Sequence, residues 1–116
     1  MILDDGILRL YRATEDSGKS GNMAAGELAE YHTAWYGERT VGMSRYYAAQ
    51  QANTSIDKVV RIRYSPGVEV RADDVAALRD GGRYRVTQAQ RLRDEDAGCT
   101  VLDLSLERVG YRDGNN

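Results

Sequence analysis

The feature that most constrains the fold is a strict alternation of apolar and polar residues near the end of the chain. In the segment 101–109, leucine occupies every second position: Leu102, Leu104 and Leu106. The residues between these leucines are polar: Asp103, Ser105 and Glu107. A period of two is typical of a β-strand with one buried face, so we expect the leucines to face a core and the polar residues to face outward.

The segment 83–93 has the same alternation and predicts the other arm of a long β-hairpin, with its turn in 94–98. The residues expected to face inward are Tyr84, Val86 and Leu92. Those expected to face outward are Arg83, Arg85, Arg91 and Arg93. Opposite charges favour a register that places Arg91 across from Asp103 and Thr87 across from Glu107.

Two more segments, 7–12 and 58–64, alternate in the same way and predict strands. The segment 28–41 is ambiguous, because Leu28, Tyr31 and Trp35 have helical spacing while Tyr31, Thr33 and Trp35 would share one face of a strand. Its β-branched and aromatic residues favour the strand. Between 23 and 34 the choice between helix and strand stays open.

Helix signals are few and short. Ser44 can cap a short helix over 46–52, and Asp73 or Asp74 can cap a single helical turn over 75–78. The segment 13–26 is rich in Gly and Ser, which predicts a long flexible loop. We expect the tail, 111–116, to fray. The sequence therefore predicts one mostly-β domain over 1–116, a small barrel or sandwich of about six strands with one short helix and long mobile loops.

Composition excludes several classes of protein. Sixteen Lys and Arg against eighteen Asp and Glu give 116 residues a net charge of −2, which argues against nucleic-acid binding driven by bulk charge but not against a local basic face. One Cys and one His exclude a disulfide framework and a Cys/His zinc cluster. The acidic start of the chain and the lack of an apolar run of about 18 residues predict a protein kept in the cytosol.

The residues that could carry catalysis do not form a convincing set. Gly18-Lys19-Ser20 resembles part of a phosphate-binding loop, but that motif needs a glycine at position 13, which is alanine. The acidic pairs at 73–74 and 94–96 are better explained as a helix cap and a solvated turn. His32 and Cys99 lack the sequence context of a nucleophile and its base. We therefore expect no enzyme, no cofactor and no bound metal.

Arginine is the remaining signal. Two strands would form a basic stripe if they were neighbours: one with Arg61 and Arg63, the other with Arg83, Arg85, Arg91 and Arg93. Such a stripe would suit a nucleic-acid backbone or an acidic protein surface. The favoured alternative is a solvated sheet face whose charges are balanced across strands by Asp103 and Glu107.

The order of several short motifs over roughly 28–109 resembles the head-tail joining, or head closure, proteins of long-tailed bacteriophages. The motifs are RTVGMSRYYAA at 39–49 after Trp35, an alternating basic and apolar strand at 59–64, DGGRYRV at 80–86 and LDLSLE at 102–107. This resemblance implies a small β-barrel in the virion neck, beneath the portal and its adaptor. Copies would form a dodecameric ring that closes the DNA-filled head and offers a surface to the tail.

The resemblance also implies partners and contact residues. The partners would be portal or adaptor ring proteins, tail-terminator or other tail proteins, further copies of the chain and, non-specifically, packaged DNA, with no membrane involved. The protein would reside in the virion neck, and in the host bacterial cytoplasm during assembly. The candidate interface or DNA-channel residues are Lys19, Tyr46, Tyr47, Arg61, Arg63, Arg83 and Arg85. Two alternatives stay open: a tail-completion or other connector protein, and a small β-barrel nucleic-acid-binding module of a prophage.

Overall fold

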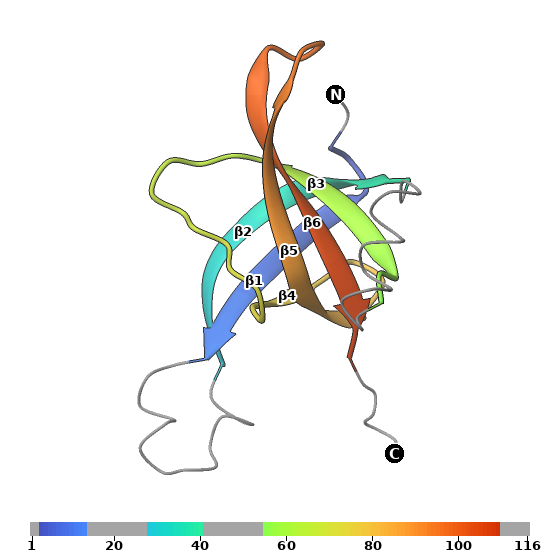
Figure 1. Cartoon of the computed structure of the whole chain (residues 1–116). Helices are drawn as coiled ribbons and strands as arrows, with labels where there is room; N and C mark the ends of the chain where they lie inside the picture. The colour runs from blue at the N-terminus through green and yellow to red at the C-terminus, as the bar shows by residue number, and fades with distance from the viewer. Residues whose placement is uncertain (1–2, 14–27, 41–54, 110–116) are drawn as a thin grey trace.

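A closed antiparallel β-barrel forms the protein in the computed structural model, which describes residues 3–13, 28–40 and 55–109 (Figure 1). Its strands are β1 (Gly6–Ala13), β2 (Leu28–Arg39), β3 (Lys58–Arg63), β4 (Val75–Ala77), β5 (Arg83–Asp94) and β6 (Cys99–Arg108). Around the barrel the order is β1-β2-β3-β6-β5-β4. The mostly-β prediction of about six strands is confirmed. Closure leaves β1 paired with both β2 and β4.

The barrel interior is filled by the alternating apolar residues of the strands. Leucine, isoleucine and valine side chains supply most of it, and two tyrosines complete it. The most deeply buried members are Leu8, Leu10, Tyr36, Val60, Ile62, Tyr84, Val86, Leu104 and Leu106. Full burial of each such side chain stabilises the fold by about 1.5–3 kcal/mol. The inward faces predicted for 7–12, 58–64 and 101–109 therefore form one core.

The ambiguous segment 28–41 is a strand over most of its length. β2 pairs with β1 from Leu28 to Tyr36 and with β3 from Tyr36 to Arg39. A bulge between Leu10 and Tyr11 shifts the register of β1 against β2.

The predicted helical turn over 75–78 is wrong, because its first three residues, Val75–Ala77, form β4 between β1 and β5. Asp73 has a φ of 77° and its main-chain N–H donates to the carbonyl of Val86, while Val86 N–H donates to the carbonyl of Asp74. These bonds draw the chain into the sheet instead of starting a helix. Closure of the barrel, which needs a strand at this position, overrides the local capping signal.

The predicted hairpin is confirmed as β5 and β6, and in Figure 1 its tip projects beyond the barrel. The predicted register is wrong: Arg91 lies opposite Leu102, and Glu107 lies opposite Arg85. An irregularity between Val86 and Gln88 adds one residue to β5.

This bulge reverses the faces of β5 beyond Thr87. Leu92, predicted to face inward, lies opposite Val101 on the outer side and does not join the core, whereas Ala89 packs against the core. Asp103 and Ser105 point outward as predicted, but they are buried there instead of solvated. The structure describes no helix; the predicted helix over 46–52, the tail and all of the loop except Ala13 lie outside the described residues.

Candidate functional site

The predicted arginines lie on two strands that are not neighbours. Arg61 and Arg63 belong to β3, Arg83 and Arg85 belong to β5, and β6 lies between these strands. The condition for a continuous basic stripe is therefore not met. Three further predicted residues lie outside the part of the chain that the structure describes: Lys19, Tyr46 and Tyr47.

Arg61 is held by two acids on the outer side of the barrel. Its Nε lies 2.6 Å from Oδ1 of Asp103 and its Nη2 lies 2.9 Å from Oδ2, which is a two-pronged ion pair. Its Nη1 also donates to Asp94 at 3.1 Å. The hydrogen bond with Asp103 raises the pKa of Arg61, although partial burial opposes this. Two carboxylates therefore balance the charge of Arg61.

Arg85 is neutralised in the same manner on the other side of β6. Its Nη2 donates to Glu107, the residue directly opposite on β6, and its Nη1 donates to Asp73 at 2.8 Å. Glu107 also accepts from the hydroxyl of Ser55 at 3.0 Å. The hydrogen bond from Arg85 lowers the pKa of Glu107. Asp103 and Glu107 thus balance the charges of Arg61 and Arg85 across the strands, as in the alternative that the sequence favoured.

Other arginines of the predicted stripe make no such contact with a carboxylate of a described residue. Arg63 and Arg83 are exposed and have no ion pair with a described residue. The guanidinium of Arg91 lies 4.3 Å from the ring centre of Tyr64, a cation–π distance. Arg63 and Arg83 thus differ from Arg61 and Arg85, whose guanidinium groups contact carboxylates.

The possible catalytic residues are dispersed. His32 lies opposite Leu10 on the β1–β2 pair, and Cys99 lies opposite Asp94 at the tip of the β5–β6 hairpin. Within the described ranges, no three His, Cys, Asp or Glu side chains group closely enough to hold a metal ion. His32 and Cys99 thus belong to two strands, β2 and β6, that do not pair with each other.

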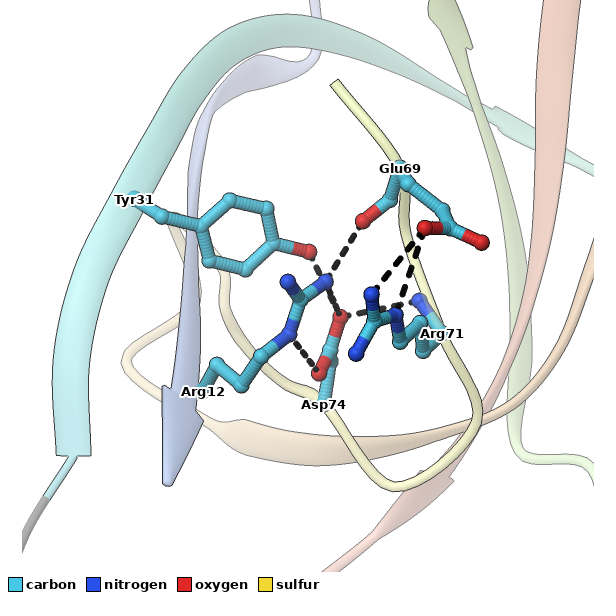
Figure 2. A network of polar contacts seen from close by, with 5 residues as sticks. All are labelled: Arg12, Tyr31, Glu69, Arg71 and Asp74. Carbon is cyan, nitrogen blue, oxygen red and sulfur yellow. Dashed lines mark hydrogen bonds and ion pairs between the residues drawn. The ribbon is translucent and has the colours of Figure 1, made fainter. Parts of the chain in front are cut away.

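A buried polar network, which the sequence did not predict, links β1, β2 and the segment before β4 (Figure 2). Arg12 donates from Nε to Oδ1 of Asp74 at 3.0 Å and from Nη2 to Oδ2 at 2.9 Å. The hydroxyl of Tyr31 donates to Asp74 at 2.6 Å, and the main-chain N–H of Arg71 donates to it at 2.9 Å. No local sequence signal could reveal it, since Arg12 and Asp74 are 62 positions apart.

This network is built to hold a carboxylate. Burial by itself would raise the pKa of Asp74, but the hydrogen bonds from Arg12, Tyr31 and Arg71 hold it below its ordinary value. Burial and the hydrogen bond to Asp74 raise the pKa of Tyr31. The guanidinium of Arg12 also lies 4.3 Å from the ring centre of Tyr31. One carboxylate thus links β1, β2 and the segment before β4 through hydrogen bonds from Arg12, Tyr31 and the main chain of Arg71.

Among the residues that the structure describes, the exposed large apolar side chains form a pair on the outer wall of the barrel. Trp35 is 57% exposed, Ile7 is 45% exposed, and they lie directly opposite each other on β2 and β1. Large aromatic side chains are enriched where proteins contact one another. Nothing in the period-two pattern distinguishes an exposed Trp35 from a buried one, so the sequence analysis did not identify this pair.

Two surface hollows adjoin Trp35 on its two sides. One, of about 580 Å³, is lined by Leu3, Asp4, His32, Thr33, Ala34, Trp35, Arg63 and Ser65. The other, of about 410 Å³, is lined by Gly6, Ile7, Arg9, Trp35, Ala77, Leu78 and Arg79. The Trp35–Ile7 pair and these two hollows thus form one continuous stretch of the outer wall, since Trp35 lines both hollows.

Comparison of the chain with protein-family models and with curated proteins finds no match in either. Within the described residues, no helix is long and apolar enough to cross a membrane.

Proposed function

We propose that the chain is a structural assembly protein of a bacteriophage neck, without enzymatic activity. It docks beneath the portal and adaptor as part of a homo-oligomeric ring, closes the DNA-filled head and provides the surface to which the tail attaches. The motif order that resembles head closure proteins motivates this proposal. The observation that carries it is the exposed Trp35–Ile7 pair on the wall of a closed barrel.

The shape of the exposed surface supports a protein partner. Trp35 and Ile7 lie side by side on a rigid sheet, where an apolar contact loses little conformational entropy when a partner binds. The hollows on both sides of Trp35 would accept side chains from that partner. An exposed tryptophan of this kind is typical of an interface residue that contributes strongly to affinity.

The charge distribution supports this proposal over the nucleic-acid-binding alternative. Nucleic-acid affinity increases with the number of phosphates that Lys and Arg neutralise. Here Arg61 and Arg85, two arginines of the predicted stripe, already form ion pairs with carboxylates of the protein. Fewer cationic groups are therefore left to neutralise phosphates. A partner protein needs no such stripe.

The test is to mix the purified chain with DNA-filled, tailless heads of the phage that encodes it, and to measure co-sedimentation and retention of DNA. We expect the chain to sediment with the heads and to reduce leakage of DNA. Trp35→Ala is expected to remain folded and to lose binding, whereas Arg108→Ala, an exposed change on a strand that pairs with neither β1 nor β2, retains it.

Two other outcomes of this experiment would support the alternative functions. Tight binding to free DNA that weakens steeply with salt, without binding to heads, would overturn the proposal in favour of the nucleic-acid-binding module. Binding to tails but not to heads would overturn it in favour of a tail-completion protein.

A further inference from the structure

A row of four side chains crosses the outer wall of the barrel at the exposed apolar pair. Ile7 on β1 lies directly opposite Trp35 on β2. On the other side of β2, Tyr36 pairs with Ile62. One step further along this antiparallel pair, Trp35 lies beside Arg63, the last residue of β3. The row thus begins with a cation at the end of β3 and continues through two apolar side chains.

A second arginine ends the row on the far side of Ile7. Arg79 follows the end of β4, which is the other neighbour of β1. It lies against Gly6, since a Cβ on that glycine would be only 2.7 Å from Cβ of Arg79. Arg79 also lines the smaller hollow together with Ile7 and Trp35. The apolar pair therefore has one arginine on each side.

Within the described residues, the arginines at both ends of the row are available to an anion from another molecule. Arg63 and Arg79 are exposed, and neither makes an ion pair with a described residue. The described residues that line the two hollows include three arginines and one carboxylate, that of Asp4. The third arginine, Arg9, has an exposed ion pair with Glu30 at 3.7 Å. The surface around the apolar pair therefore has an excess of positive charge, on a chain whose net charge is −2.

The length of the row sets the spacing of a complementary segment. Neighbouring strands lie about 4.8 Å apart, so a row over four strands spans about 14 Å from the first main chain to the last. In an extended segment every second side chain points the same way, and residues i and i+4 are also about 14 Å apart. Carboxylates at i and i+4 would therefore match the two arginines, with an apolar side chain at i+2 over the apolar pair.

We propose that this row binds an extended acidic segment of a partner protein, in which an apolar residue has an Asp or Glu two positions away on each side. The apolar side chain packs on Trp35 and Ile7, and the two carboxylates pair with Arg63 and Arg79. This inference rests on the proposed contact of Trp35 and Ile7 with a protein partner, and it specifies the chemistry of that partner. Apolar burial at the centre supplies affinity, while the ion pairs at the ends select the acidic residues and their spacing.

The test uses the full chain, labelled with ¹⁵N, and capped pentapeptides. The matching peptide is acetyl-Asp-Ser-Leu-Ser-Asp-amide. Its isomer, acetyl-Ser-Asp-Leu-Asp-Ser-amide, has the same composition and charge, but in an extended conformation both carboxylates point away from the face of the leucine. The chain contains a single Trp, so the one indole N–H signal reports binding at Trp35. We expect the matching peptide to shift this signal and to bind about threefold or more tightly than the isomer, because two exposed ion pairs distinguish them.

Variants of the protein test the two arginines. Arg63→Gln and Arg79→Gln each remove the charge at one end of the row, and each is expected to bind the matching peptide about threefold more weakly. Neither change is expected to affect binding of acetyl-Asn-Ser-Leu-Ser-Asn-amide, which has no charge. Arg93→Gln is the matched control, since Arg93 is exposed on β5 and lines neither hollow, and it is expected to bind normally.

Several outcomes would overturn the inference. Absence of an indole shift is one, and equal binding of the two isomers is another, because the spacing of the carboxylates would then have no effect. Equal binding by Arg63→Gln and Arg93→Gln would exclude the ion pair at the end of β3. If Arg79→Gln does not fold, Arg63→Gln and the two isomers decide the question. Peptide binding is measured on the isolated chain, so binding to phage heads without any preference among the peptides overturns this inference alone, and the reverse result overturns only the proposed function.

Discussion

Arg61 and Asp103 face each other across β3 and β6 and form a two-pronged ion pair, with Nε–Oδ1 and Nη2–Oδ2 distances of 2.6 and 2.9 Å. Their side chains are only 12% and 9% exposed. The alternating arginines of the sequence suggested a surface for a ligand. In the structure, Arg61 instead forms an ion pair that links β3 to β6.

Breaking this pair will destabilise the fold. Arg61→Ala leaves the carboxylates of Asp103 and Asp94 without their common partner, and we expect a loss of about 3 kcal/mol in the free energy of unfolding. Urea denaturation measures it. Arg63→Ala, an exposed change two positions along the same strand, is the control and is expected to stay within about 0.5 kcal/mol of wild type. Equal losses in the two variants would contradict the structural role of Arg61.

The network around Asp74 predicts a pH dependence of stability. The pKa of Asp74 in the folded chain lies below its ordinary value of about 3.9, which applies in the unfolded chain. The stabilisation by this carboxylate is therefore present above that value and is lost as the pH falls through the folded-state pKa. We expect Asp74→Asn to be less stable than wild type at neutral pH, and the difference to shrink below about pH 4.

Urea denaturation of the two chains over a pH series measures this difference. Asp80, Asp94 and Glu107 also have lowered pKa values, but they are present in both chains and cancel in the comparison. A difference that stays constant down to acid pH would contradict the assignment to Asp74.

Leu104 is a direct test of the barrel core. It is fully buried, opposite Val60 and Ala89. Leu104→Ala is expected to lower the free energy of unfolding by about 2–5 kcal/mol because a cavity remains. Leu92→Ala removes the same atoms from a half-buried site outside the core and is expected to cost clearly less. A loss below about 1 kcal/mol at Leu104 would place it at the surface.

Gly6 is required by its backbone conformation at the start of β1. Its φ is +151°, and a Cβ at this position would lie 2.7 Å from Cβ of Arg79. Gly6→Ala is therefore expected to lower the thermal midpoint more than Gly98→Ala, where φ is +70° but nothing lies within 4 Å of the added carbon. Each change incurs backbone strain of about 1–3 kcal/mol, and only the first adds a steric clash. A larger shift at Gly98 would refute this view.

Trp35 is expected to matter for binding and not for stability. Since its side chain is largely exposed, Trp35→Ala should leave the thermal midpoint within the range of ordinary surface changes. Binding to phage heads is expected to weaken about tenfold or more, as for a central interface aromatic. A variant that unfolds early would show that Trp35 supports the barrel instead.

The alternation of apolar residues was enough to predict the strands, since a period of two in 58–64 and 101–109 has one physical meaning. It was not enough to predict register. The bulge at Thr87 arises from the way β5 must bend around the barrel, and nothing in the local sequence marks it. For the same reason the inward position of Leu92 was predicted wrongly.

The charged residues, too, were only partly predictable from the sequence. Opposite charges favoured Arg91 beside Asp103, but strand order places Arg61 there, since β6 lies between β3 and β5. The exposure of Trp35 could not be predicted either. A strand pattern shows which residues share a face, but it does not show which of the two faces another part of the chain covers.

By itself, then, the sequence determined a mostly-β chain, the positions of its strands other than β4, and most of its core, because hydrophobic periodicity is a local property. Only the tertiary structure decided the closure of the barrel, the strand β4 in place of a helical turn, and the partners of Arg12, Arg61 and Arg85. It also decided that the side chain of Trp35 is exposed. These features depend on contacts between residues far apart in the chain, and local sequence carries no information on such contacts.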